Sequence, residues 1–290
     1  MHKQIGFIGL GKMGMPMSQR LREKGWDVVG FDIDLKVSEV SSIKELVEKL
    51  FPPRIVFLML PSGKPVETAV AEMALLLQKG DIVIDGGNSF YKDSLARARN
   101  LEQKGVVFLD AGISGGPVSI GMGKFAIMVG GKEDAYARAK EVFDDLSDTS
   151  SVYMGSSGSG HFTKMIHNGI EYGMMQSLAE GFTILKHSPF GISLEKAARA
   201  YGSNSIISSR LVDWLLQGFE QYGEDLEQVS GTVAHTGEGE WTVKTAQELG
   251  VDAPVIKEAF LFRVESAKKQ SYAGKILSML RSVFGGHSIR

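Results

Sequence analysis

The chain has 290 residues, of which 43% are hydrophobic and 23% charged, and 32 Lys and Arg against 34 Asp and Glu give a formal net charge of -2. A chain of this length can bury a sizeable core and usually forms two domains, and its near-neutral charge argues against a nucleic-acid partner or a polybasic membrane surface. The absence of cysteine excludes disulfides and thiolate metal sites. No apolar run approaches the about 18 residues of a membrane span, and we expect a cytoplasmic protein.

The first half of the chain alternates short β-branched segments with segments of helical periodicity. The expected strands are residues 4–9, 27–32, 54–60, 81–85, 106–110 and 126–129. The expected helices lie near residues 13–24, 42–50, 65–78, 92–104 and 133–146. Continuous apolar runs such as 55–60 are typical of strands buried on both faces of a parallel sheet. The alternation therefore predicts a Rossmann-type, doubly wound α/β domain.

The pattern changes after residue 155. Residues 156–160 are all serine or glycine, and a long apolar helix from about 161 to 187 follows, with several shorter helices beyond it. We therefore predict an α/β domain over residues 1–158 and an all-α domain with a C-terminal tail over residues 159–290.

A glycine-rich motif follows the first expected strand and opens the first expected helix. Its members are Gly9, Leu10, Gly11, Lys12, Met13 and Gly14. In this context a G-x-G-x-x-G run predicts a dinucleotide site, with a tight turn at Gly9, backbone access to the pyrophosphate at Gly11 and close helix packing at Gly14. The alternative is an ordinary strand–helix turn with incidental glycines.

Asp32 closes the second expected strand. A carboxylate at this place accepts hydrogen bonds from the adenosine ribose and repels a 2′-phosphate. The only close cation is Lys36, so the sequence favours NAD over NADP. The alternative role for Asp32 is to cap the following loop.

Five polar residues share one face of the long predicted helix. They are Lys164, His167, Asn168, Glu171 and Tyr172. At 3.6 residues per turn they span an arc of about 140°, and the opposite side is apolar or glycine. An amine, an imidazole and a carboxylate beside hydrogen-bonding groups suit proton transfer in a cleft. A polar stripe buried between helices, with Lys164 and Glu171 paired, is the structural alternative.

The run Lys-Met-Ile-His-Asn-Gly-Ile-Glu-Tyr-Gly at 164–173 closely resembles the catalytic helix of 6-phosphogluconate dehydrogenases, within the β-hydroxyacid dehydrogenase superfamily. Segments 85–89, 114–116 and 281–287 agree with the same family. The resemblance, which runs from about residue 4 to the terminus, is to the short, NAD-dependent, decarboxylating form. It implies oxidation of 6-phosphogluconate to ribulose 5-phosphate and CO2, a step of gluconate utilisation and the pentose phosphate pathway, without a metal.

The resemblance also implies roles for the polar helix. Lys164 would take the proton of the C3 hydroxyl and return it during decarboxylation, which requires a lowered pKa. Glu171 would protonate C1 of the enediol. Asn168 and His167 would hold substrate hydroxyls, and Tyr172 would reach the phosphate.

Further site residues follow from the same resemblance. Asn88 would touch both substrate and nicotinamide. Leu60, Pro61 and Ser62 would lie along the cofactor, and Ser114, Gly115 and Gly116 would grip the substrate carboxylate. The structural alternative for each of these two loops is a plain turn after a strand.

The resemblance assigns the substrate phosphate to Arg263, which alone would read as a surface residue, and to the C-terminal tail. In the family, Arg281 and His287 of the tail reach into the neighbouring subunit's site, which implies a homo-oligomer, either a dimer or a tetramer. Arginine suits phosphate because its planar fork donates paired hydrogen bonds.

Two departures leave alternatives open. The long members of the family carry a further helical unit that is absent here. Residues 235–242, His-Thr-Gly-Glu-Gly-Glu-Trp-Thr, also lack both cations of the long form's Lys-Gly-Thr-Gly-Lys-Trp-Thr pattern. An unphosphorylated sugar acid is therefore an alternative substrate. Other possibilities are a dehydrogenase for 3-hydroxyisobutyrate or a related β-hydroxyacid, and a non-catalytic NAD-binding regulator.

Overall fold

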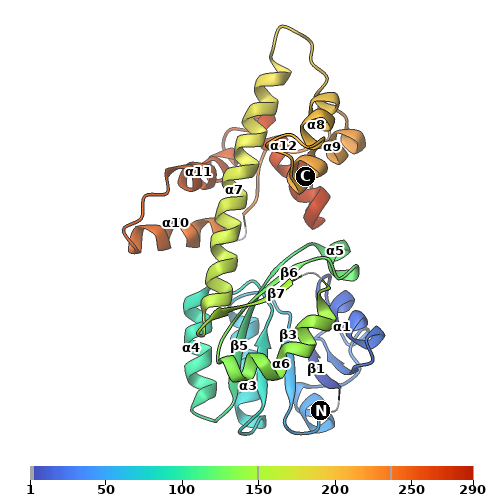
Figure 1. The fold of residues 1–290 in the computed structure, drawn as a ribbon, viewed down its shortest axis with the longest axis vertical. Coiled ribbons are helices and arrows are strands. Elements are labelled where there is room, and N and C mark those ends of the chain that lie inside the picture. The colour runs from blue at the N-terminus through green and yellow to red at the C-terminus, as the bar shows by residue number, and fades with distance from the viewer. Residues whose placement is uncertain (1–2, 149, 236, 290) are drawn as a thin grey trace. The chain divides into compact units, whose positions relative to one another are not determined.

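The computed structural model describes residues 3–148, 150–235 and 237–289 (Figure 1). The chain divides into two compact units, of which the first ends at Met165 and the second begins at Ile166. The division falls inside helix α7 (Ser159–Lys186), whereas the boundary predicted from the sequence falls just before this helix and stays a prediction. The first unit is a Rossmann-like α/β domain and the second is helical, which confirms the predicted fold class.

A single sheet runs through the first unit, in the order β2-β1-β3-β4-β5-β6-β7. The strands are β1 (Gln4–Ile8), β2 (Asp27–Phe31), β3 (Ile55–Leu58), β4 (Ile82–Asp85), β5 (Val107–Ser114), β6 (Ala126–Gly130) and β7 (Ser150–Gly155). All neighbours pair in parallel except β5 and β6, which are antiparallel. The connection between these two contains only the short helix α5 (Pro117–Gly121) and is too short for the crossover that parallel pairing needs.

Helices cover both faces of this sheet. They are α1 (Gly14–Glu23), α2 (Ile43–Lys49), α3 (Lys64–Leu76), α4 (Tyr91–Glu102) and α6 (Glu133–Leu146), together with α5. Residues of α1, α5 and α6 join one apolar cluster, in which the rings of Phe7 and Phe57 stack at 5.1 Å. Residues of α2, α3 and α4 join a second cluster with the other strand faces. The unit is therefore doubly wound, and the strand ends are left for loops.

The second unit packs α7 against shorter helices. They are α8 (Leu194–Gly202), α9 (Arg210–Tyr222), α10 (Glu238–Glu248), α11 (Pro254–Ser266) and α12 (Tyr272–Gly285). The core contains Phe182 of α7, Phe219 of α9 and Leu277 of α12. Serine side chains at positions 193, 209 and 271 accept hydrogen bonds from the first turns of α8, α9 and α12 and fix where these helices begin.

The chain after α12 packs on its own helical unit. Gly286 ends the helix in the left-handed region, with φ of 62°, which glycine adopts at little cost. Phe284 packs on Trp214 at 5.1 Å, and the backbone N–H of Ser230 donates to the carbonyl of Ile289 at 2.7 Å. Among the described residues, no helix combines the length and the apolar character that crossing a membrane requires.

Candidate active site

The predicted cofactor residues gather at the carboxyl ends of neighbouring strands. The chain leaves β1 toward β2 on one side and later returns to β3 on the other, and such a switch point is where open α/β sheets bind ligands. The loop 9–14 follows β1, Asp32 follows β2, residues 60–62 follow β3 and Asn88 follows β4. The structure thus brings these residues to one edge of the sheet.

The three motif glycines differ in what requires them. Gly9 has φ of +95°, and a Cβ there would lie 2.3 Å from the carbonyl oxygen of Met59. A Cβ on Gly14 would lie 1.8 Å from the carbonyl oxygen of Gly9, so helix and turn are in direct contact. A Cβ on Gly11 would meet no protein atom within 4 Å. The fold itself requires Gly9 and Gly14, whereas the space beside Gly11 suits a pyrophosphate at the start of α1.

Asp32 is anchored to the same loop. Its Oδ2 accepts from the backbone N–H of Leu10 at 2.6 Å, and its Oδ1 accepts from that of Asp34 at 2.9 Å. The side chain is only partly buried. Asp32 therefore caps the following turn, as the alternative reading expects, and still presents a carboxylate beside the glycine-rich loop.

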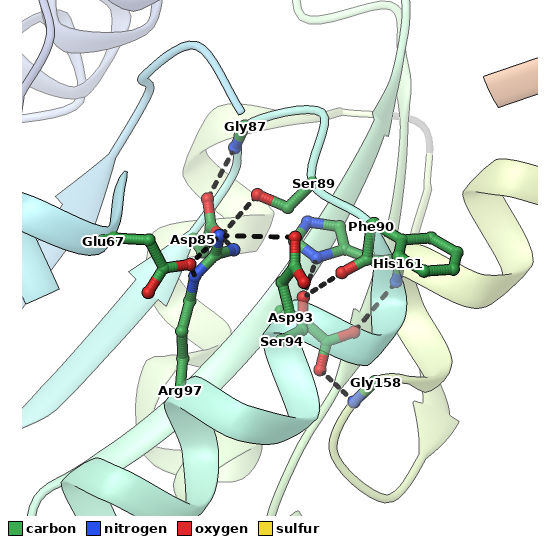
Figure 2. A network of polar contacts seen from close by, with 11 residues as sticks. Glu67, Asp85, Gly87, Ser89, Phe90, Asp93, Ser94, Arg97, Gly158 and His161 are labelled. Carbon is green, nitrogen blue, oxygen red and sulfur yellow. Dashed lines mark hydrogen bonds and ion pairs between the residues drawn. The ribbon is translucent and has the colours of Figure 1, made fainter. Parts of the chain in front are cut away.

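A buried ion pair supports the loop that carries Asn88 (Figure 2). Asp85 is fully buried and accepts from the backbone N–H of Gly87 at 3.0 Å and the hydroxyl of Ser89 at 2.8 Å. Arg97 of α4 donates to the same carboxylate at 3.1 Å and to Glu67 at 2.6 Å. Because removing one partner leaves an unpaired buried charge, this pair holds the loop rigidly while Asn88 itself is exposed.

A second buried carboxylate, Asp110 of β5, caps the start of α7. Its two oxygens accept from the backbone N–H groups of Gly158 at 2.7 Å and His161 at 2.8 Å. A negative charge at a helix N-terminus is favourable. The ring of His161 in turn lies 2.7 Å from the hydroxyl of Ser94 (Figure 2). Sequence analysis missed Asp110 and His161, because their contact joins residues far apart in the chain.

Glycines bring Lys164 against the sheet. A Cβ on Gly160 would lie 2.4 Å from the carbonyl oxygen of Asp110, so the first turn of α7 touches the β5 backbone. A Cβ on Gly112 of β5 would lie 2.4 Å from the Cβ of Lys164. The stem of Lys164 therefore rests on the strand whose end carries the partly buried Ser114, Gly115 and Gly116. Lys164, the predicted base, and the predicted carboxylate loop therefore belong to one packed substructure.

We expect Gly112→Ala to disturb this packing. The added methyl cannot be accommodated without moving Lys164 or the α7 backbone, which should cost about 1–3 kcal/mol of stability and about ten- to hundredfold in kcat. Thermal unfolding and steady-state kinetics measure the two effects. Gly121→Ala is the matched control, because a Cβ there meets nothing within 4 Å, and it should leave both quantities nearly unchanged. Equal behaviour of the two variants would contradict the packing argument.

Within the second unit, His167 and Asn168 of α7 form a hydrogen-bonded chain with α10, and Glu171 lies at ion-pair distance from His167. Nδ1 of His167 lies 3.0 Å from Oδ1 of Asn168 and 3.8 Å from a carboxylate oxygen of Glu171. Nδ2 of Asn168 donates to Oε1 of Glu238 at 3.1 Å. Glu238 is 5% exposed, and it was not among the residues predicted from the sequence.

Two arginines and Tyr172 form a cluster with the charge and burial of an anion-binding site. The guanidinium carbon of Arg263 lies 3.4 Å from the centroid of the Tyr172 ring, and Arg263 and Arg281 are only 3% and 8% exposed. Burial lowers the pKa of both guanidiniums and raises the pKa of the Tyr172 phenol. Among the described residues no carboxylate lies within 4.0 Å of either guanidinium. Two buried cations without a close counter-ion suit an anionic ligand.

The structure places the two predicted tail residues, Arg281 and His287, in different surroundings. Arg281 acts electrostatically on Tyr172 of its own chain, so the cluster contains both arginines without a second subunit. His287 is exposed beyond the end of α12. A contribution of either residue to a neighbouring subunit stays a prediction.

Comparisons with known proteins match both parts of the chain to the same family. Residues 4–155 match the family described as the NAD binding domain of 6-phosphogluconate dehydrogenase, and residues 160–282 match the 6-phosphogluconate dehydrogenase C-terminal domain. A candidate 6-phosphogluconate dehydrogenase of Bacillus subtilis is 39% identical over 98% of both chains. An NAD(+)-dependent, decarboxylating 6-phosphogluconate dehydrogenase of Haloferax volcanii is 35% identical over 99% of this chain and 98% of its own. Among solved structures, the 6-phosphogluconate dehydrogenase of Plasmodium falciparum matches with a TM-score of 0.76 at 26% identity, covering 97% of this chain and 70% of that one.

Proposed function

Because the chain belongs to the 6-phosphogluconate dehydrogenase family, we propose that it converts 6-phosphogluconate to ribulose 5-phosphate and CO2 with reduction of NAD. The observation that carries the proposal is the pair of buried arginines beside Tyr172. Tyr172 lies on α7, the helix that also bears His167, Asn168 and Glu171. A phosphate would supply the close counter-ion that neither guanidinium has among the described residues.

The first unit fits the cofactor. The loop 9–14 would bind the pyrophosphate, Asp32 the adenosine ribose, and residues 60–62 and Asn88 the nicotinamide half. When bound, NAD supplies the hydride acceptor. A carboxylate at Asp32 disfavours a 2′-phosphate, and Arg22, which Glu39 links to β2, is already neutralised by that glutamate at 2.6 Å. These features support NAD over NADP.

In the proposed reaction, Lys164 acts as general base on the C3 hydroxyl during oxidation. The resulting 3-keto acid can lose CO2 because the ketone accepts the electron pair of the broken C1–C2 bond, and the ammonium of Lys164 returns its proton to that oxygen. Glu171 then protonates the former C2 of the acid, which is C1 of the enediol. Ser114, Gly115 and Gly116 would hold the carboxylate before it leaves, and His167 and Asn168 would orient the hydroxyls.

Further assignments belong to the same proposal. Residues 1–158 would bind the cofactor, and residues 159–290 would bind the substrate phosphate and mediate self-association. The exposed His287 would complete the site of a second copy in a homo-oligomer. Sedimentation of the purified chain measures that association directly.

A second candidate is an unphosphorylated sugar acid. It is favoured by the segment 235–242, which places Glu238 and Glu240 where the resembling pattern has neutral or basic residues. Gluconate would then be oxidised as well as 6-phosphogluconate, and the arginine cluster would have another role.

A steady-state assay tests the proposal. We expect NADH and CO2 to form in equal amounts from 6-phosphogluconate, with a higher kcat/KM for NAD than for NADP and little turnover of gluconate. NADH formation without CO2, or a preference for 3-hydroxyisobutyrate, would indicate a non-decarboxylating β-hydroxyacid dehydrogenase instead. Nucleotide binding without any turnover would indicate a regulator.

A further inference from the structure

A buried carboxylate lies beside the arginine cluster, and the proposed reaction does not use it. Glu238 is the first residue of α10 and is 5% exposed. It accepts from Asn168 at 3.1 Å. Burial raises the pKa of Tyr172, Arg263 opposes that rise and Glu238 adds to it. Glu238 also counters the lowering of the pKa of Arg281 that burial causes. Its charge therefore reaches both Tyr172 and Arg281.

Tight packing fixes the place of this carboxylate. A Cβ on Gly239 would lie 2.4 Å from the ring of Tyr172, and one on Gly169 would lie 2.5 Å from a side-chain carbon of Thr242. The first turn of α10 is thus in direct contact with α7. The backbone that carries Glu238 therefore cannot move away from the cluster without separating these helices, and its side chain is held by Asn168.

Stabilisation of the helix start does not explain this position. A glutamate in the first turn is favourable whether or not it is buried. Glu240, in the same turn of α10, already supplies such a charge and pairs with Lys244 at 2.6 Å near the surface. Glu238 is a second carboxylate in this turn, but it is buried, acts on Arg281 and Tyr172, and is hydrogen-bonded to a predicted substrate residue, which points to the ligand.

We propose, on the basis of the function proposed above, that Glu238 is a specificity-determining residue that discriminates a sugar phosphate from a simple inorganic anion. Its charge offsets part of the attraction that Arg263 and Arg281 exert on any anion. A small anion that meets only the guanidiniums therefore gains little. A sugar phosphate also presents hydroxyl groups that hydrogen-bond to the Asn168–Glu238 pair. These hydrogen bonds restore the binding free energy that the charge of Glu238 takes from the phosphate.

The test is Glu238→Gln, because the amide keeps an acceptor for Asn168 and removes only the charge. Calorimetric titration of the full chain with inorganic phosphate needs no turnover. We expect about three- to tenfold tighter phosphate binding in the variant, the effect of one partly screened charge at short range. The KM for 6-phosphogluconate should stay equal or rise, so that the selectivity for the sugar phosphate falls by a similar or larger factor. Glu240→Gln removes a charge from the same helix and should change neither value.

Phosphate affinity that is the same in the wild type and in Glu238→Gln, with both proteins unfolding at the same temperature, overturns the proposal. So does a wild type that binds inorganic phosphate as tightly as 6-phosphogluconate. The proposed function fails separately, through absence of turnover with 6-phosphogluconate. In that case tighter phosphate binding by Glu238→Gln would still support the role of Glu238 at the anion pocket.

Discussion

Replacing Lys164 with methionine should lower kcat for oxidation of 6-phosphogluconate by about 10³- to 10⁴-fold, the upper range for loss of a general acid–base group. Methionine has a similar length and fills the space on Gly112 of β5 that the lysine stem occupies, so the first turn of α7 should remain in place. The affinity for NAD should hardly change, because the glycine-rich loop follows β1 and Asp32 follows β2, whereas Lys164 lies on α7. Single-turnover kinetics and titration of NAD binding measure the two quantities.

Lys186→Met is the matched control for this prediction. Lys186 lies on the same helix and pairs with Asp225 at 2.5 Å, far along the chain from the polar stripe. Its loss should leave kcat within about twofold, as expected for a surface pair. A wild-type-like rate in Lys164→Met would remove the assignment of the base. A parallel loss of NAD affinity would instead indicate that α7 had shifted.

The first half of the fold is predictable from the sequence because its strands are buried on both faces. The runs predicted at 54–60 and 81–85 correspond to β3 and β4, and the first glycine-rich turn follows β1 as expected. The sequence does not reveal β7, because it begins with two serines at the sheet edge and is only partly buried. Nor does it reveal that β6 runs antiparallel to β5, since strand direction depends on the length of the connection.

The candidate catalytic side chains are predictable from the sequence, but the contacts that position them are not. The spacing of Lys164 and Glu171 on one helix is a local pattern. In contrast, Asp110 meets His161 and Asn168 meets Glu238 only after the chain has folded. The surroundings of Arg281 within its own chain are equally hidden from the sequence. Helix α12 packs in the same helical core as α7, and Arg281 acts on Tyr172 of its own chain, while the role in a neighbouring subunit's site that the family resemblance implies stays a prediction.

The arginine cluster gives the second large prediction, which separates recognition of phosphate from catalysis. Arg263→Met should lower kcat/KM for 6-phosphogluconate by about 10²- to 10³-fold, as expected when a buried charge-assisted contact is lost. Most of the loss should be in KM, because Arg263 lies on α11 and takes no part in the proton transfers. The slow turnover of gluconate should be unchanged, since that substrate has no phosphate.

Stability provides the check that the loss is functional. Burial lowers the pKa of Arg263, which means that its charge is unfavourable in the free protein, so methionine removes a cost as well as the contact with Tyr172, worth about 1–2 kcal/mol. These terms oppose each other, and the unfolding temperature should change little. Arg199→Met removes an exposed arginine that is paired with Glu195 and Glu220. It should leave kcat/KM unchanged for both 6-phosphogluconate and gluconate. If Arg263→Met slowed gluconate and 6-phosphogluconate by the same factor, the residue would be a structural support of α7, and the phosphate would have to bind elsewhere.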